Sequence, residues 1–173
     1  MRRWAAGQGG YTLIEVIITV AISAVVMSAL TSVILTTVRA ASTASARVEA
    51  SAQIRGFESF AYDDMVASGV PSALGCTSAS SACTTQPLTL AGTQASNSST
   101  PAINPYQVTY TWDGSSFLDR QAGGSAVHVA TDVTSFSWYV TSNGARQIVV
   151  VSMTVTVNSY SESQTFLFYP RVQ

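Results

Sequence analysis

One carboxylate, that of Glu15, lies near the start of an apolar run that extends from Tyr11 to Val38 and has no other charged residue. A charged side chain at the centre of a bilayer costs roughly 2.5–3.5 kcal/mol on insertion scales. A cationic partner would offset this cost. A cut between Gly10 and Tyr11 would create one, because the new α-amino group would lie about one helical turn from Glu15. In an assembly of similar helices, that amine can belong to a neighbouring subunit.

The surrounding octapeptide is Gly9-Gly10-Tyr11-Thr12-Leu13-Ile14-Glu15-Val16. It resembles the cleavage and methylation motif of type IV pilin-like proteins, with Tyr11 where phenylalanine is usual. The resemblance implies cleavage after Gly10 by a prepilin peptidase, N-methylation of Tyr11, and assembly into a filament through Glu15. The alternative is an ordinary membrane anchor whose Glu15 lies near the cytoplasmic headgroups.

The arginines around the apolar run indicate its orientation. Arg2 and Arg3 precede the run, which favours a cytoplasmic N-terminus and a C-terminal domain outside the membrane. The run is longer than the roughly 20 residues that span a bilayer and longer than a secretory signal core of about 7–15 residues. We therefore expect it to remain as a single-pass span, which the resemblance to pilin-like proteins places in the bacterial inner membrane.

The composition bears on possible partners. Hydrophobic residues make up 47% of the chain and charged residues only 10%. Loss of residues 1–10 would leave six arginines against nine acids, a side-chain charge of −3. Nucleic-acid binding needs clustered cations to neutralise phosphates, so we expect no nucleic-acid partner.

Residue patterns divide the chain into five segments. We expect a cleaved leader over residues 1–10, a membrane or filament-core helix over 11–38, the amphipathic half of the same helix over 39–68, a Ser/Thr-rich connector over 69–105 and a β-sheet region over 106–173. The amphipathic half should bury apolar side chains that recur at near-helical spacing, namely Val48, Ile54, Phe57, Ala61 and Met65. Gly69 and Pro71 then stop the helix.

Alternating apolar and polar residues predict antiparallel strands after residue 105. Asp113-Gly114 and Asn143-Gly144 are typical of hairpin turns. The expected strands are Tyr106–Trp112, Ser116–Arg120, Val133–Thr141, Ile148–Asn158 and Gln164–Tyr169. Their alternation predicts one buried face, which the amphipathic half of the helix should cover. The fold class is therefore α+β, with a long N-terminal helix packed on a small antiparallel sheet.

Cys76 and Cys83, the two cysteines of the chain, lie in a Ser/Ala/Thr-rich loop. An outward domain is in an oxidising space, where such a pair usually forms a disulfide. The alternative, a metal site, would need further Cys or His ligands, and His128 is distant in sequence. We expect a disulfide and no bound metal.

The remaining polar residues give no catalytic pattern. His128 lies in a short β-like run, where a histidine is more often structural than a general base. Asp63 and Asp64 are adjacent on one helix and point apart, whereas calcium requires six to eight oxygen ligands. We assign these two acids to contacts with a neighbouring subunit or to a cap beyond the helix. The chain is expected to be neither an enzyme nor a cofactor-binding protein.

Shorter similarities point to a subgroup of the pilin-like proteins. The segments involved are Arg55, Phe60 and Asp64 before Ala67-Ser68-Gly69, then Val108-Thr109-Tyr110, Leu118-Asp119-Arg120 and Asp132-Val133-Thr134-Ser135-Phe136. They resemble the W-type minor pilins of pili and the J-type minor pseudopilins of type II secretion. This resemblance implies a tip complex that initiates assembly. Its partners would be other pilin or pseudopilin subunits, the prepilin peptidase and the assembly platform of the inner membrane.

Two further functions stay open at this level. A competence pilin that takes up DNA would need a basic tip, for which the β region offers Arg120, Arg146 and Arg171. A membrane-tethered binding protein would need a polar pocket, which the sequence does not indicate.

Overall fold

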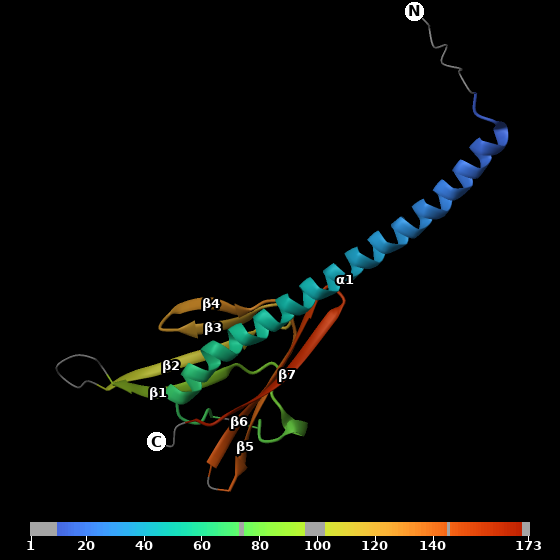
Figure 1. Ribbon diagram of the computed structural model, residues 1–173. Coiled ribbons are helices and arrows are strands. Elements are labelled where there is room, and N and C mark those ends of the chain that lie inside the picture. Colours follow the sequence, from blue (N-terminus) through green and yellow to red (C-terminus); the bar gives the residue numbers. More distant parts are fainter. Residues whose placement is uncertain (1–9, 73–74, 96–102, 145, 171–173) are drawn as a thin grey trace, which may run out of the picture. The chain divides into compact units, whose positions relative to one another are not determined.

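The computed structural model describes residues 10–72, 75–95, 103–144 and 146–170 (Figure 1). The chain divides after Ser42 into two compact units. The first unit contains the N-terminal part of helix α1 (Leu13–Ala67). The second contains the remainder of α1 and all the strands that the structure describes. The long helix expected from the sequence is thus confirmed, with its end two residues before Gly69.

The helical residues of the first unit are exposed along their whole length. Several of their hydroxyl groups donate hydrogen bonds within the helix, as illustrated by Thr31 Oγ1, which donates to the Met27 carbonyl at 2.8 Å, and Thr37 Oγ1, which donates to the Val33 carbonyl at 2.8 Å. A bilayer offers no hydrogen-bond partners, so internal bonds of this kind suit a lipid environment. Among the described residues, α1 is the one helix long and apolar enough to cross a membrane.

The second unit holds two antiparallel sheets (Figure 1). The four-stranded sheet has the order β1-β2-β3-β4 and the three-stranded sheet the order β5-β6-β7. The strands are β1 (Leu88–Ala95), β2 (Ile103–Trp112), β3 (Leu118–Ala122), β4 (Ser125–Ala130), β5 (Val133–Asn143), β6 (Arg146–Val157) and β7 (Tyr160–Phe168), and a short 3-10 helix, η1 (Ala79–Ser81), precedes them.

The strand pattern agrees with the α+β expectation and refines it. The turns at Asp113-Gly114 and Asn143-Gly144 are confirmed, since they join β2 to β3 and β5 to β6. Two sheets replace the one expected, and the supposedly irregular connector contains β1. The alternation in β1 is short: only Leu88 and Leu90 are buried before Ala91 and Gly92 follow. Such a segment carries too little periodicity to be recognised from the sequence.

The core of the second unit forms where α1 meets the inner faces of both sheets. The helix contributes a buried stripe of Ala46, Ala50, Ile54, Phe57, Ala61 and Met65. Phe57 is central to it, with its ring centroid 5.6 Å from that of Tyr110 in β2, 6.0 Å from Phe136 in β5 and 5.5 Å from Phe166 in β7. One aromatic side chain therefore contacts both sheets.

Val48 does not belong to this buried stripe, contrary to the sequence-based expectation. Its side chain is 71% exposed. The six steps from Val48 to Ile54 turn an α-helix by about 600°, which places the two side chains roughly 120° apart. Ala46 and Ala50 take the inner positions instead. Ala46 is 3% exposed and Ala50 is fully buried.

Gly92 of β1 lies against the C-terminal end of α1. A Cβ atom at this position would come within 2.5 Å of the Ala67 carbonyl oxygen and 2.9 Å of the Ser68 Cα atom. The amide of Gly69 donates to the Ala91 carbonyl at 2.9 Å just beside it. The helix end is therefore fixed to the edge of the four-stranded sheet by direct backbone contact.

Candidate assembly site

The predicted processing segment lies at the start of the described chain. Gly10, Tyr11 and Thr12 precede the helix, and the amide of Glu15 donates to the Thr12 carbonyl at 3.0 Å. Tyr11 is 83% exposed, and Glu15 lies in the first helical turn with its side chain also exposed. The structure shows no partner for the Glu15 carboxylate among the residues it describes.

The position of Glu15 in the first helical turn lowers the electrostatic cost of placing its charge in the bilayer. It does not remove that cost. An acid in the first turn gains about 0.3–1 kcal/mol from the helix dipole. Placing a charge at the bilayer centre costs roughly 2.5–3.5 kcal/mol on insertion scales. The dipole therefore offsets a minor part of the cost. A cation from outside the helix remains the natural partner for the carboxylate.

A second acid on the same helix, Asp64, is fully satisfied within the second unit. Its side chain is 3% exposed and receives two hydrogen bonds from Arg120, with Nε at 2.7 Å from Oδ2 and a terminal guanidinium nitrogen at 2.7 Å from Oδ1. The hydroxyl of Tyr106 donates to Oδ1 and that of Tyr110 to Oδ2. Arg120 also lies over the ring of Phe60, 5.6 Å from its centroid.

Strand register assembles this cluster. Tyr110 of β2 pairs directly with Arg120 of β3, so both side chains leave the same face of the sheet. Tyr106 lies four residues before Tyr110, and residues an even number apart on a strand share a face. All three donors consequently point to the side of the sheet where α1 places Asp64.

The cluster keeps Asp64 charged in spite of its burial. Burial alone would raise the pKa of Asp64, but the hydrogen bonds from Arg120, Tyr106 and Tyr110 outweigh it and hold the pKa below its ordinary value. Burial and the adjacent carboxylate raise the pKa of Tyr106 to about 12 and shift that of Tyr110 in the same direction. The acid is thus an anion held by three donors, and it ties the end of α1 to β2 and β3.

This cluster corrects the interpretation of Asp64. From the sequence it was assigned with Asp63 to a neighbouring subunit or a cap, yet Asp64 is bound inside its own domain, whereas Asp63 is exposed. The two acids are adjacent on a helix, so one points into the core and the other away from it. The arrangement of Tyr106 and Tyr110 on one strand face was visible in the sequence. Their partner, 42 residues or more away, was not.

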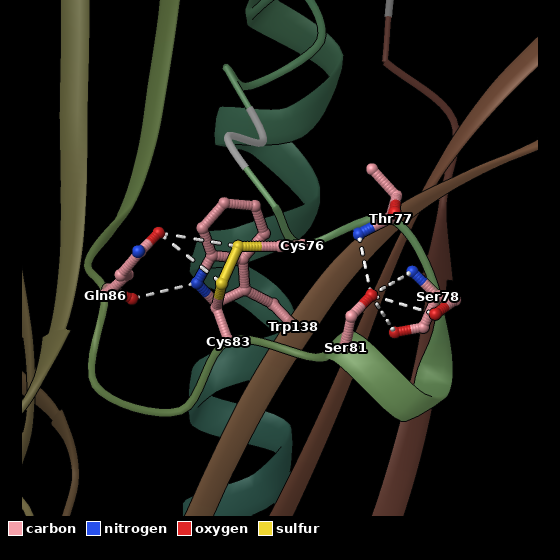
Figure 2. The surroundings of a disulfide bond; sticks show 7 residues. All are labelled: Cys76, Thr77, Ser78, Ser81, Cys83, Gln86 and Trp138. Carbon is pink, nitrogen blue, oxygen red and sulfur yellow. Dashed lines mark hydrogen bonds between the residues drawn. A yellow bond between two sulfur atoms is a disulfide. The ribbon is translucent and has the colours of Figure 1, made fainter.

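The structure joins Cys76 and Cys83 in a disulfide, and the loop between them covers the outer edge of β5 (Figure 2). Cys83 exchanges two backbone hydrogen bonds with Trp138, at 2.9 and 3.0 Å, and the Val140 amide donates to the Cys76 carbonyl at 2.8 Å. The Trp138 indole donates to the Gln86 carbonyl at 2.9 Å. The bridged loop therefore occupies a strand edge that would otherwise be open to pairing.

His128 lies in β4, as its β-like run predicted. Its Nδ1 atom is hydrogen-bonded to Asp119 Oδ1, and its ring lies 4.9 Å from that of Phe117. Within the described ranges, no group of three or more His, Cys, Asp and Glu side chains has the arrangement needed to hold a metal ion. The contacts of His128 with Asp119 and Phe117 form a small exposed cluster at the β3–β4 hairpin.

Comparison with known proteins bears on the N-terminal segment. Residues 6–31 match the family model described as the prokaryotic N-terminal methylation motif. No curated protein and no solved structure matched the chain significantly. The matched segment contains Gly10, Tyr11 and Glu15. It supports a type IV pilin-like or pseudopilin-like subunit, and such a motif implies prepilin peptidase processing and assembly with other pilin subunits. The apolar helix and the motif are consistent with a single-pass anchor in the inner membrane.

Proposed function

We propose that the protein is a structural minor pilin or minor pseudopilin. It is cut after Gly10, methylated on Tyr11 and built into the tip or initiation complex of a type IV pilus or a type II secretion pseudopilus. The observation that carries this proposal is the Glu15 carboxylate, which lies at the start of an apolar helix, inside the methylation motif, and has no partner among the described residues.

The pairing chemistry follows from the position of this acid. Cleavage creates an α-amino group on Tyr11, and the amine of one subunit meets the Glu15 carboxylate of the next as the helices pack. In a medium of low dielectric constant both the desolvation cost and the attraction are large, so an unpaired charge is strongly disfavoured. The pair therefore sets the axial register of subunits as they leave the membrane.

The second unit supports a structural role through its construction. The helix end is held by the Asp64 cluster and by the backbone contact at Gly92, while the disulfide-bridged loop covers the edge of β5. The Asp64 cluster of the second unit thus serves to hold α1 against β2 and β3. A DNA-uptake role loses one of its three candidate arginines, since Arg120 is bound to Asp64 with its side chain 20% exposed. Arg146 is exposed, and Arg171 lies outside the described residues.

The decisive experiment replaces Glu15 in the full-length protein and follows three readouts in the native host. In Glu15→Ala, membrane insertion and leader removal stay normal, while incorporation into sheared filaments falls at least about tenfold, because an unmatched amine is left in low dielectric. Glu49→Ala, which removes an exposed acid further along α1, is the matched control and should assemble normally. Normal incorporation of Glu15→Ala would refute the pairing.

Processing is tested separately from pairing. Gly10→Val should block cleavage and leave the precursor at its slower gel mobility, whereas mass spectrometry of the mature wild-type N-terminus should show a methylated Tyr11. An unchanged mobility shift for Gly10→Val, or an unmethylated mature N-terminus on another residue, would contradict the assignment.

A further inference from the structure

The disulfide-bridged loop occupies the place of a partner strand at the edge of β5. Cys83 exchanges two backbone hydrogen bonds with Trp138, and the Cys76 carbonyl accepts a third from the Val140 amide. Trp138 and Val140 are two residues apart, which is the interval at which a strand presents its amides to one edge. The two cysteines are 7 residues apart in the sequence, and their disulfide brings them to this edge together (Figure 2).

The segment that follows Cys76 has little apolar attachment to the rest of the second unit. We call residues 77–87 the flap. None of its side chains is buried, whereas Cys76 and Leu88 on either side of it are fully buried. Buried apolar area is the main source of packing energy, and the flap contributes little of it. The disulfide therefore supplies much of the hold that keeps the flap on β5.

The two half-cystines differ in their access to solvent. Cys76 is fully buried, whereas Cys83 is only partly buried. Reduction of a disulfide begins when a thiolate attacks one of the sulfur atoms, and access decides which one is attacked. The attack should therefore occur at Cys83. After reduction, Cys76 can keep its buried position as a small apolar side chain, so the flap should open at its Cys83 end.

Gln86 is placed to accept hydrogen bonds from the reduced cysteines. Its side-chain oxygen lies 3.5 Å from Cys76 Sγ and 3.4 Å from Cys83 Sγ (Figure 2). A disulfide sulfur has no proton to donate, whereas a thiol does. The backbone carbonyl of Gln86 accepts a hydrogen bond from the Trp138 indole at 2.9 Å, which holds the residue beside the bridge. The site thus offers a hydrogen-bond acceptor that only the reduced pair can use.

We propose that the Cys76–Cys83 bond is a redox-controlled latch, which a dithiol opens to uncover the backbone edge of Trp138. A thiolate of the dithiol bonds to Cys83 Sγ, the Cys76–Cys83 bond breaks, and Cys76 leaves as a thiolate that takes a proton from water. The second thiolate of the dithiol attacks its own partner sulfur in the mixed disulfide and releases the Cys83 thiolate, which is protonated in turn. Two electrons pass to the cysteines, and the dithiol becomes a disulfide.

The consequence of opening is a free strand edge. The N–H and C=O groups of Trp138 lose their partners on Cys83, and such an edge is available for pairing with another strand. The reverse exchange, with an oxidised dithiol, closes the latch. This inference concerns the second unit alone and does not depend on the proposed function, which is judged by methylation of Tyr11 and incorporation into filaments.

The test measures amide hydrogen exchange at single residues in the full-length protein in detergent, before and after reduction with dithiothreitol. The Trp138 amide faces the flap. The amide of Tyr139, which pairs with Val150 of β6, faces the opposite edge and reports any general loss of stability. We expect reduction to accelerate exchange at Trp138 at least about tenfold more than at Tyr139. Equal acceleration at the two amides, or none at Trp138, would overturn the inference.

Cysteine variants complete the test. Cys76→Ser/Cys83→Ser should show the fast Trp138 exchange without reductant and should not respond to dithiothreitol; slow exchange in this variant would refute the latch. The single variants show which sulfur atom is accessible. The thiol of Cys83 in Cys76→Ser should react with 5,5′-dithiobis(2-nitrobenzoic acid) at least about tenfold faster than the thiol of Cys76 in Cys83→Ser. Equal rates, or a faster reaction at Cys76, would contradict opening at the Cys83 end.

Discussion

Glu15 and Asp64 are acids on one continuous helix, and they have opposite environments. Asp64 is enclosed and receives hydrogen bonds from Arg120, Tyr106 and Tyr110. Glu15 is exposed at the helix start, and the described chain offers it no partner. Asp64 serves the folding of a single chain, and its removal should affect stability. Under the proposed function, Glu15 is satisfied by another chain, so its removal should affect assembly.

The largest expected effect on stability comes from Asp64→Ala. It leaves the Arg120 guanidinium without its counter-ion beside the buried phenol of Tyr110 and the half-buried phenol of Tyr106, and breaking a buried pair in this way costs about 3–5 kcal/mol. Denaturant unfolding of the full-length protein in detergent, followed by the fluorescence of Trp112 and Trp138, measures the change.

Two controls sharpen this comparison. Asp63→Ala and Glu15→Ala remove exposed acids of the same helix and should change the free energy of unfolding by no more than about 0.5 kcal/mol. If Glu15→Ala destabilised the second unit as strongly as Asp64→Ala, the separation of the two roles would fail.

The next effect concerns the disulfide that holds the loop on β5. Its cysteines are 7 residues apart, and the chain-entropy model assigns about 2.5 kcal/mol to a loop of this size. The double variant Cys76→Ser/Cys83→Ser should lose that much stability. Reduction of the wild-type protein should produce a similar loss, and reductant should leave the variant unchanged. A strong further effect of reductant on the variant would contradict this explanation.

A smaller effect is expected from Tyr106→Phe. It removes one of the three donors to Asp64 while Arg120 and Tyr110 remain, and a hydrogen bond to a charged group contributes about 1.5–3 kcal/mol. We expect the lower end of this range because Tyr106 is only half-buried. Tyr62→Phe, at a 61% exposed tyrosine, is the control and should be neutral in the same unfolding assay. Equal losses in the two variants would argue against the cluster.

A change of pH is expected to have the smallest effect on the stability of the protein. Because the folded pKa of Asp64 lies below its unfolded value, the cluster's stabilisation is complete above that unfolded value, about 3.9. It is lost as the pH falls through the folded pKa. The stability difference between wild type and Asp64→Asn should therefore be constant above about pH 5 and shrink below about pH 4. A difference that grew on acidification would contradict the assigned protonation states.

Sequence patterns were most reliable where the reason for a structure is local. The continuous apolar run, the absence of proline and the Gly69 stop specify α1, and the Asp-Gly and Asn-Gly pairs specify two turns. In the first of these, Asp113 Oδ1 accepts hydrogen bonds from the amides of Ser115 and Ser116, each at 2.8 Å. The motif around Gly10 and Glu15 is equally local, since its chemistry depends on spacing along one helix.

Only the tertiary structure decided which polar and apolar residues face the core. It paired Asp64 with donors far along the chain, left Val48 exposed, and split the strands into two sheets. Each outcome depends on strand register and on how one helix packs on two sheets. Neither of these two features is encoded in a window of neighbouring residues. The sequence alone therefore determined that the start of the helix carries a single acid within a long apolar run. The packing of the helix on the sheets determined that Asp64 is internal, because only the register of β2 and β3 brings its three donor residues to one place.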